Sequence, residues 1–127
     1  MEKAPKKILV IEDDKGLQQA ICDKLKMSGY QVVLARTKNE GIDALIENED
    51  ICFIWLDHYL FGQEDGLDFL NEIRHNDQWV QIPLFVISNT ASNEKVKTYL
   101  ALGVDKYFTK AEYKLEEIID DIKKFVK

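Results

Sequence analysis

Cysteine and long apolar runs are scarce in this chain of 127 residues, and both shortages narrow the class of protein. Only Cys22 and Cys52 are present, each within a predicted regular element, which argues against a disulfide-stapled fold and favours a reducing compartment. No apolar run approaches the roughly 18 residues that a membrane-spanning helix requires. Residues 1–7 are rich in charge and lack the apolar stretch of a secretory signal. We therefore expect a cytoplasmic protein with no membrane association.

A surplus of basic residues is also missing. The chain has 17 basic and 23 acidic residues, giving a formal net charge of −6, which argues against a general binder of nucleic-acid backbones. With 46% hydrophobic and 31% charged residues, the composition is that of an ordinary globular protein. The length suits a single domain with a substantial core, which we expect to span residues 1–127.

Apolar segments and helical periodicity alternate along the whole sequence. Five segments are predicted as strands, namely Lys7–Ile11, Gln31–Ala35, Ile51–Leu56, Leu84–Ile87 and Lys106–Thr109. A helix is predicted after each strand, with inward-facing side chains at Leu17, Ala20, Ile21 and Leu25; Ile42, Leu45 and Ile46; Leu67, Leu70 and Ile73; Val96, Tyr99 and Leu100; and Leu115, Ile118, Ile119 and Ile122. This alternation predicts an α/β fold in which helices cover both faces of a doubly wound parallel sheet.

Charged residues stand at the carboxyl ends of the predicted strands, the edge at which open parallel sheets bind ligands. Glu12-Asp13-Asp14 follows the first strand, Asp57 follows the third, and Lys110 follows the fifth. Together these groups suit a divalent cation and a phosphoryl group, because clustered carboxylates repel one another until a hard cation binds them. Simpler interpretations also exist: a helix start for one or two of the triplet, Asp13 or Asp14 but not Glu12, a loop cap for Asp57, and a solvated side chain for Lys110.

The order of these residues resembles that of the response regulator receiver domains of two-component signalling, in particular a stand-alone receiver like the chemotaxis regulator. The resemblance covers essentially the whole chain. It is carried by Glu12, Asp13, Asp57, Ser88 and Lys110, by the aromatic Tyr107, and by the sequence Asp65-Gly66-Leu67. It implies a flavodoxin-like three-layer sandwich with five parallel strands in the order 2-1-3-4-5.

The resemblance also implies a mechanism and partners. A histidine kinase or a phosphotransfer protein would phosphorylate Asp57, with Mg²⁺ held by Glu12, Asp13, Asp57 and the main-chain carbonyl of Tyr59. Lys110 and Ser88 would contact the phosphoryl oxygens. Ser88 and Tyr107 would act as the switch that changes the surface formed by the fourth helix, the fifth strand and the fifth helix. A downstream effector would read that surface, and a second copy of the chain is a further candidate partner.

Three residues depart from the family pattern. Phe61 and Ala111 replace prolines, and Asn89 replaces a small residue next to Ser88. A cis peptide bond before alanine costs about 3–4 kcal/mol, so we expect Lys110-Ala111 to be trans and Lys110 to be somewhat shifted. These departures motivate a second hypothesis, a phosphate-independent interaction module on the same fold.

The third hypothesis is that the protein is a free-standing enzyme. We expect no enzymatic activity other than Mg²⁺-dependent self-phosphorylation and self-dephosphorylation. A phosphohydrolase with an aspartyl nucleophile would use two aspartates two residues apart after the first strand, a pattern that Glu12 and Asp14 fit poorly. A flavin-binding protein of this topology is disfavoured by the acidic first loop. His58, next to Asp57, is predicted to lie on the loop surface rather than to be a ligand.

Overall fold

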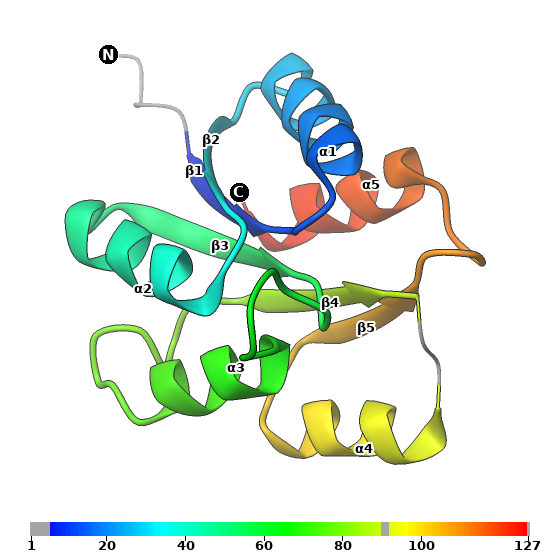
Figure 1. Cartoon of the computed structure of the whole chain (residues 1–127). Coiled ribbons are helices and arrows are strands. Elements are labelled where there is room, and N and C mark those ends of the chain that lie inside the picture. Colours follow the sequence, from blue (N-terminus) through cyan, green and yellow to red (C-terminus); the bar gives the residue numbers. More distant parts are fainter. Residues whose placement is uncertain (1–5, 90–91, 127) are drawn as a thin grey trace.

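The computed structural model describes residues 6–89 and 92–126, in which five strands alternate with five helices (Figure 1). The strands are β1 (Lys7–Ile11), β2 (Gln31–Ala35), β3 (Ile51–Leu56), β4 (Leu84–Ser88) and β5 (Lys106–Thr109). The helices are α1 (Lys15–Met27), α2 (Lys38–Glu47), α3 (Gly66–Arg74), α4 (Asn93–Ala101) and α5 (Leu115–Phe125). The predicted alternation is confirmed, although residues 1–5 of the charged opening segment lie outside the described residues.

All four strand pairings are parallel, and the order across the sheet is β2-β1-β3-β4-β5. This is the doubly wound, flavodoxin-like arrangement that the resemblance implied. The chain passes from β1 outward to β2 and then crosses back to β3 on the other side of β1. The carboxyl ends of β1 and β3 therefore flank the point where the strand order reverses, which is where open α/β sheets form a crevice.

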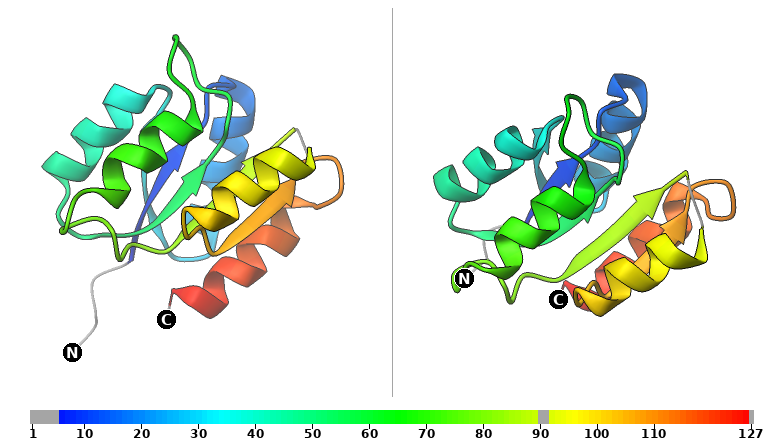
Figure 2. Two further views of the ribbon diagram at one scale, coloured as in Figure 1. Left: turned by 90° about the horizontal axis from the view of Figure 1, so that it is seen from below. Right: turned by 60° about the horizontal axis from the view of Figure 1, so that its bottom comes forward.

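Helices cover both faces of the sheet, as the uninterrupted apolar sequence of β3 predicted. Figure 1 shows α1 and α5 on one face, while the left view of Figure 2 shows α2, α3 and α4 in front of the other. Phe53 and Trp55 of β3 belong to the α1/α5 core, whereas Ile54 and Leu56 belong to the core beneath α2, α3 and α4. Each such fully buried side chain contributes about 1.5–3 kcal/mol to folding. Within the described residues, no helix is long and apolar enough to span a membrane.

Two residues predicted to face inward are exposed instead. Ile46 on α2 is 62% exposed and Leu100 on α4 is 49% exposed. On α2 the buried side consists of Gly41, Ala44 and Leu45. A Cβ at Gly41 would lie only 2.8 Å from Ile11 and 2.9 Å from Phe69, so the helix docks on its glycine and Ile46 turns outward. On α4 only Tyr99 is fully buried, and the next residue is rotated away from the sheet.

Arg74, the last residue of α3, ties this helix to the turn that follows α4. Its guanidinium donates three hydrogen bonds to main-chain carbonyls: to Leu102 at 2.9 Å, to Val80 at 2.8 Å and to Gly103 at 3.1 Å. Bonds from a charged donor are stronger than those between neutral groups. The carboxyl end of α4 is therefore fixed to α3.

Candidate functional site

Main-chain hydrogen bonds extend the parallel ladder one residue beyond the strands and so fix the site residues. The amide of Asp57 donates to the carbonyl of Ile11 at 3.0 Å. The amide of Lys110 donates to the carbonyl of Ser88 at 2.8 Å, and the amide of Glu12 donates to the end of β2 at 3.0 Å. The side chains that follow β1, β3 and β5 therefore meet at one edge of the sheet, as predicted.

Three carboxylates converge at this edge. Glu12, Asp13 and Asp57 each offer an oxygen, and these oxygens lie within 4.8 Å of one another. Glu12 is fully buried and Asp57 is 2% exposed. Asp14 is not part of this cluster, because its Oδ1 accepts the amide of Leu17 at 2.9 Å and caps α1. The helix-start interpretation is thus confirmed for Asp14, and Glu12 and Asp14 do not pair in the cluster as a phosphohydrolase would require.

Lys110 reaches into the cluster and bridges two of its members. Its Nζ donates to Glu12 Oε1 at 2.8 Å and to Asp57 Oδ2 at 3.1 Å. Burial, reinforced by the negative charge of Asp57, raises the pKa of Glu12 to about 8 although the hydrogen bond from Lys110 opposes the change. Burial by itself would lower the pKa of Lys110, but Glu12 and Asp57 outweigh it and raise that pKa. The lysine is therefore charged at neutral pH and is not a solvated surface residue.

Asp57 Oδ1 is a buried oxygen with no hydrogen-bond partner among the described residues. A buried carboxylate oxygen without a donor is costly. A hard cation or an incoming phosphorus atom would relieve that cost. The donor set of three carboxylates and the unpaired oxygen therefore fit a divalent cation beside Asp57.

The remaining predicted residues lie around the same edge. A cavity of about 500 Å³ is lined by Glu12, Asp13, Asp14, Leu17, Asp57, Tyr59, Asn89 and Lys110, and we call it the acid cavity. Ser88 is fully buried at the end of β4. Burial raises the pKa of Tyr107, while a hydrogen bond with the Ser88 side chain lowers it in part, so the two predicted switch residues are in contact.

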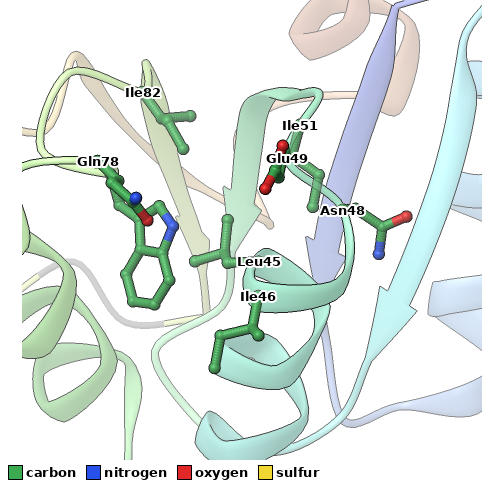
Figure 3. Close-up of a pocket in the computed structure, with 8 residues that line it drawn as sticks. Leu45, Ile46, Asn48, Glu49, Ile51, Gln78 and Ile82 are labelled. Carbon is green, nitrogen blue, oxygen red and sulfur yellow. The ribbon is translucent and has the colours of Figure 1, made fainter.

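A second cavity, of about 570 Å³, lies at the opposite end of the sheet (Figure 3). In Figure 3, Leu45 and Ile46 of α2 face Gln78 and Ile82 of the α3–β4 connection across it. Ile51, the first residue of β3, places this cavity at the amino ends of the strands. No group of potential metal ligands lies there among the described residues. The clustered carboxylates and Lys110 lie instead at the acid cavity.

The residues that depart from the family pattern are accommodated without displacing Lys110 from the carboxylates. The Phe61 ring is largely exposed, and the Arg36 guanidinium lies 4.9 Å from its centre. Arg36 Nε in turn donates to the carbonyl of Asp13 at 3.1 Å. Asn89 lines the acid cavity. The peptide bond between Lys110 and Ala111 is trans, as expected.

The prediction that His58 lies on the surface is wrong. It is 5% exposed, and its Nδ1 lies 2.6 Å from the Tyr99 hydroxyl. The loop turns back on itself, because the amide of Gly66 donates to the carbonyl of His58 at 2.7 Å. One signal for this contact was present in the sequence, since a tyrosine on the inner face of α4 needs a partner for its hydroxyl.

Comparisons with known proteins agree with this geometry. The sequence profile described as "Response regulator receiver domain" matches residues 8–123. Chemotaxis protein CheY4 of Vibrio cholerae superposes with a TM-score of 0.85 at 21% identity, covering 95% of this chain and 98% of CheY4. A CheY-like receiver domain protein from Methanospirillum hungatei gives a TM-score of 0.84 at 26% identity, with coverage of 95% and 93%.

The Mn²⁺-bound form of response regulator Rcp1 is also similar, with a TM-score of 0.81 at 27% identity and coverage of 95% of this chain and 94% of Rcp1. The profile spans most of the chain, and the fold and the clustered acids agree with it. The chain therefore belongs to the response regulator receiver domain family of two-component signalling systems.

Proposed function

We propose that this receiver domain accepts a phosphoryl group on Asp57 from a histidine kinase or a phosphotransfer protein in a Mg²⁺-dependent reaction. Receiver domains are signalling modules rather than conventional enzymes, and family membership implies such donors together with effectors. The observation that carries the proposal is the setting of Asp57. Its carboxylate is buried, keeps Oδ1 unpaired, and lies beside two further carboxylates and the ammonium of Lys110.

Glu12, Asp13, Asp57 and the main-chain carbonyl of Tyr59 would hold the cation. The three carboxylates lie close enough to share one ion, and Tyr59 lines the same cavity. The Mn²⁺-bound form of Rcp1 supports a divalent cation in this fold. When bound, Mg²⁺ would neutralise the carboxylates and the oxygens of the transferring group.

In the transfer step, a carboxylate oxygen of Asp57 forms a bond to phosphorus while the bond from phosphorus to the donor imidazole nitrogen breaks. The nitrogen keeps the electron pair. Lys110 would then exchange part of its contact with Glu12 and Asp57 for the phosphoryl oxygens, and Ser88 would donate to one of them. The side chains of Ser88 and Tyr107 are hydrogen-bonded. A movement of Ser88 toward the phosphoryl group would therefore also move Tyr107 and change the α4/β5/α5 surface, where an effector would bind.

Beryllofluoride with Mg²⁺ tests the proposal, since the pair mimics an aspartyl phosphate. Trp55 is buried two residues before Asp57, and Trp79 lines the second cavity, so a Trp79→Phe background isolates the nearer reporter. We expect a saturable change in Trp55 fluorescence that requires both reagents and disappears in Asp57→Asn. A response that persists in Asp57→Asn, or none in the parent protein, would contradict the proposal.

A phosphate-independent interaction module is the second candidate. Asn89 favours it, because this residue lines the acid cavity at a position where the family normally has a small side chain. Pull-down of partners with Asp57→Ala and with the parent protein separates the two functions. Full retention of every partner by Asp57→Ala would favour the interaction module.

A further inference from the structure

Helix α4 contacts the two residues that directly follow Asp57. The Lys95 ammonium lies 5.0 Å from the centre of the Tyr59 ring and 3.3 Å from its hydroxyl. One turn later, the Tyr99 hydroxyl lies 2.6 Å from Nδ1 of His58. Residues four apart on a helix share one face, so a single face of α4 holds both loop residues.

The contact with His58 is the buried one of the two. Tyr99 is fully buried and His58 nearly so, whereas the Tyr59 ring is half exposed. Burial lowers the pKa of His58 and raises that of Tyr99, so both groups are neutral. Asp65 Oδ2 lies 3.6 Å from Nε2 of His58 and favours the tautomer with its proton there. Nδ1 then accepts, and the Tyr99 hydroxyl donates.

The same hydroxyl and the main-chain carbonyl of the phosphoacceptor both lie against Gly66. A Cβ on Gly66 would lie 2.6 Å from the Tyr99 hydroxyl, 2.7 Å from the carbonyl oxygen of Asp57 and 3.0 Å from Cα of His58. These atoms therefore close around one glycine with no room for a methyl group. Tyr99 also lies 5.7 Å from the Tyr107 ring, centre to centre. Tyr99 is therefore linked to the 57–66 loop both by its hydrogen bond to His58 and by its close approach to Gly66.

We propose that Tyr99 is a positioning residue that, through its hydrogen bond to His58, couples α4 to the main chain of residues 57–59. The inference rests on the proposed function, because that main chain would carry both the phosphoryl group and the Tyr59 carbonyl at the cation. It adds a connection to α4 that does not pass through Ser88. Since coupling between two sites is reciprocal, a partner bound to α4 would also change the affinity of the acid cavity for its ligands.

Amide hydrogen exchange in α4, measured with and without Mg²⁺ plus beryllofluoride, tests this coupling. Tyr99→Phe keeps the ring and removes the hydroxyl, and His58→Leu removes the acceptor. Tyr113→Phe is the matched control, because Tyr113 is a partly exposed tyrosine whose ring packs on Phe108. Melting temperatures establish that each variant folds. If Tyr99→Phe does not fold, the test is made with His58→Leu alone.

In the wild type and in Tyr113→Phe we expect the ligands to change the exchange of residues 93–101. In Tyr99→Phe and His58→Leu this change is lost while beryllofluoride still binds, and the double variant shows no further loss. His58→Asn, whose side-chain oxygen can accept from the Tyr99 hydroxyl, restores the response. If the single variants bind the ligands and retain the full α4 response, the coupling is refuted and the proposed function survives. If the wild type binds no beryllofluoride, both the coupling and the proposed function are refuted.

Discussion

Replacing Glu12 with glutamine is expected to remove a loss of stability that the wild type shows between pH 4.5 and about pH 8. Glu12 is fully buried beside Asp57, and burial followed by that neighbouring charge raises its pKa from 4.5 to about 8. Glutamine keeps the size and the hydrogen-bonding oxygen of the side chain but cannot ionise.

The sign and size follow from proton linkage. Below pH 4.5 the side chain is protonated in both states, so its contribution to stability is fully present. Between pH 4.5 and about 8 the unfolded chain releases the proton while the folded protein retains it, so rising pH favours unfolding. The free energy of unfolding then falls by about 1.4 kcal/mol per pH unit, on the order of 5 kcal/mol across the window. The raised pKa of Lys110 acts only above 10.5, outside this range.

Urea denaturation at pH 5, 6.5 and 8 measures the effect as the difference between wild type and Glu12→Gln. That difference should grow with pH in favour of the variant. Glu47→Gln, an exposed carboxylate at the end of α2, should show no such trend. Adding Mg²⁺ should flatten the wild-type curve, because a bound cation would keep Glu12 ionised. Parallel pH curves for wild type and Glu12→Gln would refute the reasoning.

Three further predictions concern stability in the absence of ligand. Lys110→Met leaves the buried carboxylate of Asp57, next to the protonated Glu12, without its cation. It should lower the free energy of unfolding by about 3–5 kcal/mol in urea titrations at neutral pH; a loss below about 1 kcal/mol would contradict this. Gly66→Ala places a methyl group against the Tyr99 hydroxyl and should lower the free energy of unfolding by about 1–3 kcal/mol. The loss should appear as a lower melting temperature. An unchanged melting temperature would contradict the prediction and show that the loop rearranges to accept the methyl group. Leu45→Ala should cost about 2–5 kcal/mol, whereas Ile46→Ala on the same helix should cost much less, because the first side chain is buried and the second is exposed; equal losses in calorimetry would contradict the assigned helix face.

The convergence of Glu12, Asp57 and Lys110 was predictable from sequence because it depends on a general property of parallel sheets. Each residue follows an apolar segment, and the carboxyl ends of parallel strands lie at one edge. The strand order could not be obtained in this way, since alternation alone leaves several orders open. It came from the resemblance, and the structure confirms it.

The errors concern contacts between elements distant in sequence. His58 was predicted to lie on the loop surface because its partner, Tyr99, lies 41 positions later, on α4. Ile46 fitted an inward stripe, but the close approach of neighbouring side chains to Gly41 sets the rotation of α2. Periodicity gives the spacing of a helical face, whereas the neighbours decide which residues of a broad face are covered.

Arg74 anchors the carboxyl end of α4 while the amino end of the helix has no such anchor from Arg74. Because its guanidinium is hydrogen-bonded to the turn at residues 102–103, a displacement of Tyr99 or Lys95 would be expected to tilt the helix about this end. The first turn of α4 would then move farthest, and Leu100, next to the anchored turn, would move least. A protein that binds the first turn of α4 would therefore discriminate best between the two positions of this helix.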